Sequence, residues 1–312
     1  MKHVSLGGLD VSRVGLGTMA MSGYYLDPTS SEAESIRTIQ RALDLGVTHI
    51  DTAEIYGPYA NEELVGRAIN GRRDEVVLAT KFGWDVRLGG DAPRGSRPYL
   101  RGAIDASLER LRTDHVDLYY YHRPDGVTPL EETLDAMSEL VGEGKTRAVG
   151  CSNLSAEQLR VAHELARATG RPQIAGLQNR YSLLDRDAER DVLPLCRDYG
   201  IGFVPYLPLA SGLLTGKYRR GEPSPPGSRL ENRPEVRTDE RLERVEALEA
   251  FAKERGHTLL ELAIGGLASQ PGVVSVIAGA TTPEQVRANA AASWRLSKAE
   301  LSALSELLGP PP

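Results

Sequence analysis

The chain alternates between short apolar runs and longer segments in which apolar residues recur every three or four positions. Short runs are typical of buried strands, and the longer segments are typical of helices that pack one face against a sheet. Residues 3–12 are a predicted β-hairpin around the turn pair Gly7-Gly8. After it we expect eight strand-then-helix units, with strands at 13–17, 47–50, 75–80, 116–121, 146–150, 174–177, 201–206 and 273–278.

Capping signals at the predicted helix starts support the same alternation. Ser31 with Glu34, and Ser155 with Gln158, fit capping boxes, in which each side chain bonds the backbone amide of the other residue. Asn61 is a candidate cap for the second helix. The predicted helices include 31–45, 62–69, 100–111, 130–141 (begun by a capping box at 128–131 with a proline at its first helical position), 188–199 and a helix capped by Thr282.

Eight such units predict an α/β fold of the closed (β/α)8 TIM barrel type. The alternative is an open doubly wound sheet, which needs a glycine-rich dinucleotide turn after an early strand. The segment Gly15-Leu16-Gly17 lacks the third glycine at the required offset. The length of 312 residues is usual for one barrel with insertions, so we predict a single domain over residues 1–312.

Residues 217–237 interrupt the alternation after the seventh strand. This segment has no apolar periodicity and carries prolines at 223, 225, 226 and 234. Loops of this length are usually functional lids or disordered segments. A domain boundary is disfavoured because too little chain follows to build a second core, and we predict a long loop that orders over a bound ligand.

Composition excludes several classes of function. The net charge of −6, without a basic stripe, argues against a protein that binds nucleic acid. No apolar run is long enough to span a bilayer, and the first residues lack the apolar core of a secretory signal. Cys151 and Cys196 give neither a disulfide framework nor a zinc-binding spacing. These features together predict a cytoplasmic protein without a structural metal.

The C-terminal ends of the predicted strands each carry a polar, aromatic or glycine residue. Barrel active sites lie at this end of the strands. Each residue alone has a structural explanation: Asp51 can cap a turn, Lys81 can be solvated, and a lone His122 is more often structural than catalytic. A full ring of such residues is difficult to explain by stability alone. The ring comprises Gly17-Thr18, Asp51, Lys81, His122, residues 151–153, Gln178-Asn179, Tyr206 and residues 279–282.

Asp51, Tyr56, Lys81 and His122 would form a proton donor aimed at a carbonyl oxygen if they converge, although Tyr56 alone could be an ordinary surface tyrosine. A free tyrosine has a pKa near ~10, and a nearby lysine ammonium lowers that pKa because it favours the phenolate. Asp51 would keep the lysine charged, and the imidazole would orient the carbonyl. No activated serine or cysteine is evident, so we expect a hydride from a nicotinamide to attack the carbon.

Several segments together resemble the aldo-keto reductase superfamily, and the resemblance covers essentially the whole chain. The segment Gly-Thr-Met-Ala-Met-Ser at 17–22 is most similar to the branch that includes pyridoxal reductase-like enzymes. The segments that carry the resemblance are Asp-Thr-Ala-x-x-Tyr-Gly at 51–57, Thr-Lys-Phe-Gly at 80–83, His-Arg-Pro-Asp at 122–125, Gly-x-Ser-Asn at 150–153, Leu-Gln-Asn-x-Tyr-Ser at 177–182 and Pro-Leu-Ala-Ser-Gly-Leu-Leu-Thr-Gly-Lys at 208–217.

The resemblance implies reduction of aldehydes or ketones by NADPH bound across the rim of the barrel. It implies Tyr56 as general acid, Lys81 and Asp51 as the pair that tunes it, and His122 as the residue that orients the carbonyl. Tyr24, Tyr25 and Trp84 are expected at the mouth of the substrate pocket, from their place just past rim segments. The expected cofactor-binding residues are Gly17, Thr18, Met19, Asp51, Ser152, Asn153, Gln178, Tyr206, Pro208, Leu209, Ser211, Lys217, Arg229, Gly279, Thr281, Gln285 and Asn289.

One departure from the family pattern concerns the choice of cofactor. Members strict for NADPH often carry Lys or Arg between the positions matching 279 and 285, but here that stretch has no basic residue. Arg287 and Arg229 are the remaining partners for a 2′-phosphate, so NADPH is expected and NADH is the alternative. Instead of binding the cofactor, Gln285 can also have a structural role as the third residue of a helix capped by Thr282, with its side chain bonded to the N-terminus of that helix.

Two other classes of function remain open alternatives. Potassium-channel β subunits share the expected fold and bind nicotinamide cofactors, but they act as partner proteins. They carry asparagine at the position that matches His122, so His122 argues against this alternative. A Schiff-base aldolase would use Lys81 as its nucleophile and would need no nicotinamide.

Overall fold

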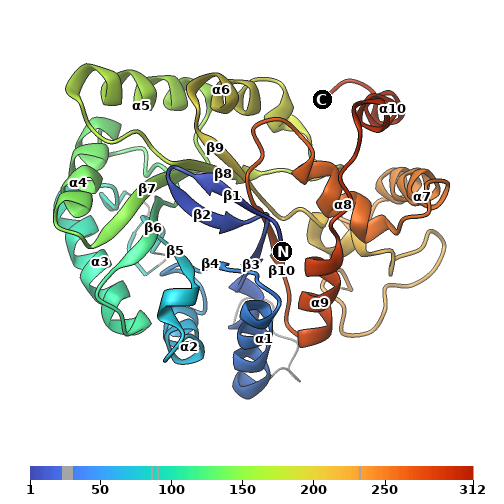
Figure 1. Cartoon of the computed structure of the whole chain (residues 1–312), viewed down its shortest axis with the longest axis horizontal. Coiled ribbons are helices and arrows are strands. Elements are labelled where there is room, and N and C mark those ends of the chain that lie inside the picture. Colours follow the sequence, from blue (N-terminus) through green and yellow to red (C-terminus); the bar gives the residue numbers. More distant parts are fainter. Residues whose placement is uncertain (23–30, 86, 90, 232, 312) are drawn as a thin grey trace.

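Eight parallel strands close into a barrel, which confirms the predicted α/β fold class (Figure 1). The computed structural model describes residues 1–22, 31–85, 87–89, 91–231 and 233–311. Strands that follow one another in the sequence are neighbours, and β10 closes the ring by pairing with β3 and β9. The barrel strands are β3 (Val14–Gly17), β4 (His49–Asp51), β5 (Val77–Phe82), β6 (Val116–Tyr121), β7 (Thr146–Ser152), β8 (Gly176–Arg180), β9 (Gly202–Tyr206) and β10 (Val276–Gly279).

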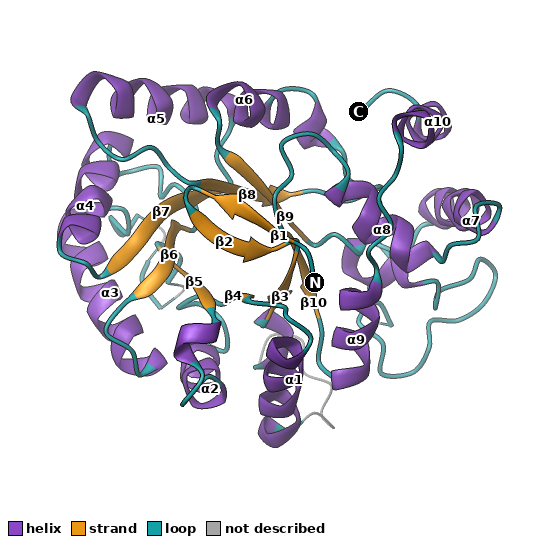
Figure 2. Ribbon diagram, viewed as in Figure 1, coloured by secondary structure: helices purple, strands orange, loops and turns teal. Residues whose placement is uncertain are grey.

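Helices surround the barrel, as Figure 2 shows. Their buried apolar residues belong to the same core cluster as those of the strands. None of the described helices combines the length and the apolar character that crossing a bilayer requires. The helices are α1 (Glu32–Asp44), α2 (Ala60–Ala68), α3 (Arg97–Leu111), α4 (Leu130–Gly142), α5 (Ala156–Thr169), α6 (Val192–Tyr199), α7 (Asp239–Lys253), α8 (Leu259–Ala268), α9 (Pro283–Ala291) and α10 (Lys298–Leu308), with short 3₁₀ turns η1 (Met19–Met21), η2 (Arg73–Glu75), η3 (Asp187–Glu189) and η4 (Ala210–Thr215).

The predicted N-terminal hairpin covers the end of the barrel where the strands begin. Its strands, β1 (His3–Leu6) and β2 (Leu9–Ser12), pair antiparallel and lie across the barrel opening in Figure 1. Leu6 is fully buried against the first residues of β8 and β9. A Cβ on Gly202 would overlap with the Leu6 side chain, so the glycine makes room for it. Since this end is filled, the opposite rim is left for a site.

Two predicted helix caps are wrong because their polar side chains bond elsewhere. The helix α2 begins before Asn61, which lies fully buried in its first turn and does not cap it. The helix α4 has no side-chain cap, since the Thr128 hydroxyl instead donates to Asp125 at 2.7 Å. By contrast, Ser155 and Gln158 form the predicted capping box.

Several predicted element boundaries also differ from the structure, including those of one helix and two strands. The helix predicted over 188–199 is divided into η3 and α6, because the Asp191 carboxylate accepts a hydrogen bond from the first amide of α6. The strand predicted at 174–177 is β8, which begins later and runs to Arg180. The last strand, β10, begins at Val276, since Val273 forms only an isolated bridge with Phe203.

A buried carboxylate, Glu54, joins two loops of the rim. Its side chain is in the turn after β4, and the residue is only 3 % exposed. Its Oε1 accepts hydrogen bonds from the amides of Gly83 at 2.8 Å and Trp84 at 3.3 Å, and from the Tyr99 hydroxyl at 2.8 Å. Burial raises the pKa of Glu54 to about 7, although the hydrogen bonds from Tyr99 and Gly83 oppose the rise. The loop after β5 is therefore fixed to the turn that carries Tyr56.

The substitution Glu54→Gln should remove a pH dependence of stability. Because the pKa of Glu54 rises from 4.5 to about 7, its contribution to stability is full below pH 4.5 and is lost as the pH rises through 7. That change corresponds to about 3 kcal/mol. The stability of the variant relative to the wild type should therefore increase by about 2–3 kcal/mol between pH 5 and pH 8 in urea unfolding. An identical difference at both pH values would contradict this account.

Candidate active site

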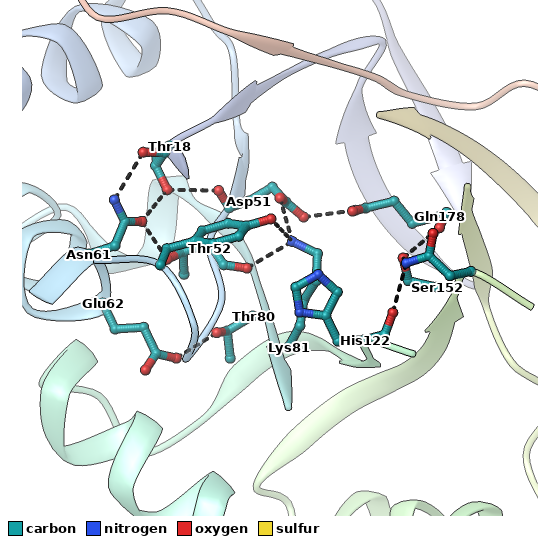
Figure 3. Close-up of polar contacts among 12 residues, drawn as sticks. Thr18, Asp51, Thr52, Asn61, Glu62, Thr80, Lys81, His122, Ser152 and Gln178 are labelled. Atoms are coloured by element: carbon teal, nitrogen blue, oxygen red, sulfur yellow. Dashed lines mark hydrogen bonds and ion pairs between the residues drawn. The ribbon is translucent and has the colours of Figure 1, made fainter. Parts of the chain in front are cut away.

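Lys81 places a charged amine inside the mouth of the barrel. Its side chain is fully buried in β5, and Figure 3 shows it among residues from neighbouring strands. Its Nζ donates to Asp51 Oδ1 at 2.6 Å, to the carbonyl oxygen of Thr52 at 2.9 Å and to the Tyr56 hydroxyl at 3.3 Å. Burial alone would lower the pKa of Lys81, but Asp51 and Tyr56 outweigh it and raise that pKa. The amine therefore stays protonated, and the alternative of a solvated Lys81 is wrong.

Asp51 is held from two sides at the end of β4. Its Oδ1 pairs with the Lys81 ammonium, and its Oδ2 accepts a hydrogen bond from Gln178 Nε2 at 2.8 Å. The residue is 3 % exposed, so both of its oxygen atoms rely on protein partners. These contacts connect β4, β5 and β8 across the barrel (Figure 3).

The Tyr56 hydroxyl accepts a hydrogen bond from the ammonium, which leaves its own proton for another acceptor. The predicted net lowering of its pKa is wrong: burial raises the pKa of Tyr56, and Lys81 only opposes that rise. A phenol in this state is protonated at neutral pH, as a proton donor must be. Lys81 can still assist, because it stabilises the phenolate that remains once the proton has left.

The imidazole of His122 lies beside the phenol. The ring centroids of His122 and Tyr56 are 6.0 Å apart, and the two planes are nearly perpendicular at 84°. Burial, followed by the charges of Lys81 and Arg123, lowers the pKa of His122 well below its usual value. A neutral imidazole carries one N–H donor, and such a donor can orient a carbonyl oxygen. The structure thus brings all four predicted catalytic residues together.

The residues expected at the nicotinamide form a connected chain of hydrogen bonds. The Tyr206 hydroxyl donates to Asn153 Oδ1 at 2.8 Å, and Asn153 Nδ2 donates to the carbonyl oxygen of His122 at 2.9 Å. Ser152 Oγ donates to the carbonyl oxygen of Gln178 at 2.6 Å. Among the described residues, nothing donates to Gln178 Oε1, so this oxygen is the acceptor available to a carboxamide.

The turn after β9 has an unusual backbone where the diphosphate is expected. Leu207, Ala210 and Ser211 all have positive φ, at 55°, 46° and 60°, which non-glycine residues rarely adopt. Lys217 follows η4, and within the described chain no carboxylate pairs with its ammonium, which lies 5.2 Å from the centroid of the Tyr218 ring. A free ammonium beside a sharply turned backbone suits a phosphate group. Pro208 and Leu209, also expected there, lie in the same turn.

The start of α9 is open to a ligand. Gly279 pairs with Gly17 at the ends of β10 and β3, and a Cβ on Gly279 would meet no atom nearer than 4.0 Å. Gln285 accepts a hydrogen bond from the Thr281 amide at 2.8 Å, and Asn289 donates to the Gly279 carbonyl at 3.2 Å. An open backbone next to a helix N-terminus fits the phosphates of a dinucleotide.

Asn61 is a supporting residue that the sequence analysis assigned to a different role. Its Oδ1 accepts hydrogen bonds from the hydroxyls of Thr18 at 2.5 Å and Thr52 at 2.6 Å, and its Nδ2 donates to the Thr18 carbonyl at 2.9 Å. Thr18, expected to bind the cofactor, is thereby turned inward, whereas Met19 is half-exposed. An asparagine close to two threonines at strand ends is the only signal that could have indicated this connection.

Trp84 forms a wall beside His122, with ring centroids 4.9 Å apart. It is 37 % exposed, so its face is available at the rim. Tyr24 and Tyr25, the other expected substrate residues, lie outside the residues that the structure describes.

The described residues of 217–237 contain no helix or strand, as predicted, but the loop is anchored. Tyr218 and Leu230 are buried, and the Tyr218 hydroxyl accepts a hydrogen bond from the Leu230 amide at 3.2 Å. Arg219 pairs with Glu249 of α7. Arg229, expected to cover the phosphates, is half-buried in this loop.

Comparison with known proteins agrees with this geometry. The model of the "Aldo/keto reductase family" matches residues 13–308. The chain is 37 % identical over 318 aligned positions to the aldo-keto reductase YhdN of Bacillus subtilis (strain 168), covering 99 % of this chain and 94 % of the relative. It is also 37 % identical over 314 positions to the probable aldo-keto reductase 1 of Glycine max, covering 98 % of this chain and 88 % of the relative. A barrel of this kind, matched over nearly its whole length, belongs to the aldo/keto reductase family of nicotinamide-dependent oxidoreductases.

Proposed function

We propose that this protein reduces an aldehyde or ketone to an alcohol with NADPH, and that Tyr56 donates the proton. The observation that carries the proposal is the Lys81 ammonium, which is shared between the Asp51 carboxylate and the Tyr56 hydroxyl. We also propose that residues 1–312 form one barrel domain.

The reaction follows from the positions of the side chains. A reduced nicotinamide bound at the ends of β7 to β10 would supply the hydride that the carbonyl carbon accepts. His122 holds the carbonyl oxygen near the phenol, and Tyr56 gives its proton to that oxygen as negative charge develops. Lys81 stabilises the resulting phenolate, and Asp51 keeps Lys81 charged and in place.

The cofactor would lie across the ends of β7 to β10. Ser152, Asn153 and Gln178 would hold the carboxamide, and Tyr206 would support the ring. The turn at 208–217 would hold the diphosphate, and the open backbone at Gly279 would accept the adenosine end.

Two alternatives fit the geometry less well. An aldolase needs a neutral lysine as nucleophile, whereas Asp51 raises the pKa of Lys81 after burial has lowered it. A partner protein without catalysis would not need His122 beside the phenol. Repeated turnover of small aldehydes with a nicotinamide would exclude a non-catalytic partner protein. Failure of borohydride to trap substrate on Lys81 would exclude an aldolase.

Replacing Tyr56 by phenylalanine should reduce kcat by at least 100-fold, because general acid catalysis typically contributes 10²–10⁴-fold. The cofactor dissociation constant should change less than about threefold, since the phenol touches only the reacting oxygen in this proposal. Tyr59→Phe is the matched control, because its hydroxyl bonds Asp85 at 2.6 Å, away from Lys81. Near-normal turnover by Tyr56→Phe would show that another group is the acid.

Arg287→Gln should raise the dissociation constant for NADPH about tenfold and leave that for NADH unchanged. The residue is exposed on α9, two positions after Gln285, and a 2′-phosphate is the group that distinguishes the two cofactors. Fluorescence titrations with both cofactors measure the effect, with exposed Arg295→Gln as the control. Equal losses for both cofactors would contradict recognition of the 2′-phosphate by Arg287.

The loop 217–237 should be cut more slowly by trypsin at saturating NADPH than without it. Its buried anchor at Leu230 restrains it, and contacts with the diphosphate would restrain it further. Leu230→Ala should speed cleavage in the absence of cofactor, because it removes the anchor. Cleavage rates that do not respond to NADPH would argue against a lid.

A further inference from the structure

Arg123 holds a positive charge at the mouth of the candidate active site. It directly follows His122, and its side chain is exposed. The guanidinium carbon lies 5.0 Å from the centroid of the Trp84 ring, and that ring in turn lies 4.9 Å from the His122 ring. The guanidinium and the imidazole therefore contact the same indole, and stacking on it restricts the directions that Arg123 can take.

This charge is not neutralised within the described part of the chain, where no carboxylate pairs with Arg123. The nearest acid along the sequence, Asp125, is already committed. Its carboxylate accepts hydrogen bonds from the amides of Gly95 at 2.7 Å, Val127 at 2.9 Å and Thr128 at 2.8 Å, and also from the Thr128 hydroxyl. Among the described residues, nothing accepts a hydrogen bond from the Arg123 guanidinium, in a chain whose formal net charge is −6.

The charge of Arg123 also acts on two groups at the mouth of the site, His122 and Tyr206. After burial and Lys81, it is the third cause that lowers the pKa of His122. On the other side, burial raises the pKa of Tyr206, while Arg180, Arg123 and Lys81 oppose that rise. The guanidinium therefore lies near enough to His122 and Tyr206 for its charge to act on both.

We propose that Arg123 recognises an anionic group on the substrate, so that the preferred substrates are aldehydes or ketones that carry a carboxylate or phosphate. A guanidinium binds such groups through two parallel hydrogen bonds. The cofactor is expected over β7 to β10, whereas Arg123 follows β6 and contacts Trp84 of the β5 loop, so the anion belongs to the substrate. Because the guanidinium and the imidazole contact the same indole, an anion bound to Arg123 should stand about one aromatic ring away from a carbonyl held by His122. This inference rests on the proposed carbonyl reduction.

The test compares 4-carboxybenzaldehyde with its neutral methyl ester, methyl 4-formylbenzoate. The wild type should have a kcat/KM for the acid at least tenfold above that for the ester. In Arg123→Gln, KM for the acid should rise on the order of 10- to 100-fold, with kcat and the ester kinetics within twofold. Arg123→Lys should restore part of the loss, since it keeps the charge but not the fork of donors. 4-Formylphenyl phosphate should likewise be preferred over benzaldehyde, since its phosphate stands one aromatic ring from the carbonyl, and Arg123→Gln should remove that preference.

Arg87→Gln is the matched control. Arg87 also stacks on an aromatic ring, with 3.9 Å between its guanidinium carbon and the Tyr59 centroid, but its charge is paired with Asp85. Its replacement should leave the preference for the acid unchanged. An equal effect of Arg123→Gln on acid and ester, no preference for the acid in the wild type, or a raised KM for NADPH would each overturn the proposal.

A binding measurement separates this inference from the proposed function. Calorimetry with 4-(hydroxymethyl)benzoate, the alcohol that the reduction would form, should show binding that Arg123→Gln weakens at least tenfold. Binding without turnover of any carbonyl compound would contradict the proposed reduction but support the anion site. Turnover of neutral aldehydes without any charge preference would do the reverse.

Discussion

The ion pair between Lys81 and Asp51 is the interaction on which the site depends. Removing one partner of a buried pair typically costs about 3–5 kcal/mol, because the other charge is left without compensation. Here the cost of burial is offset because every N–H of the ammonium has an acceptor and both oxygens of the carboxylate have donors. The contacts span β4, β5 and β8, so the closed barrel and the ion pair require each other.

Burial sets the other protonation states around this pair. A site with little water favours neutral forms, which raises the pKa of Tyr56 and of Glu54 and lowers the pKa of His122. Lys81 is the exception because Asp51 lies 2.6 Å away. The result is a buried ion pair next to a neutral phenol and a neutral imidazole, where its field acts strongly on any charge that forms at the phenol oxygen.

The architecture and the convergence of the rim residues could be predicted from the sequence, because the strand-then-helix period specifies a barrel and a barrel gathers strand ends. Side-chain interactions outside the recognised motifs could not. Asn61 was assigned as a helix cap, yet it bonds the hydroxyls of Thr18 and Thr52. The direction of the pKa change at Tyr56 was also missed, because pairing with lysine is visible in a motif whereas the degree of burial is not. Helix and strand limits shifted by a few residues for similar reasons, as at Asp191 and Val273.

The hairpin that fills the far end of the barrel has a kinetic consequence. Leu6 occupies the space that Gly202 leaves, so within the described residues the hairpin fills that end of the barrel. The cofactor and the carbonyl compound would therefore both enter and leave at the rim formed by the C-terminal ends of the strands. If the cofactor binds beneath the carbonyl compound at this rim, the carbonyl compound would bind second and its alcohol would leave first, and the filled end of the barrel would favour compulsory-order kinetics.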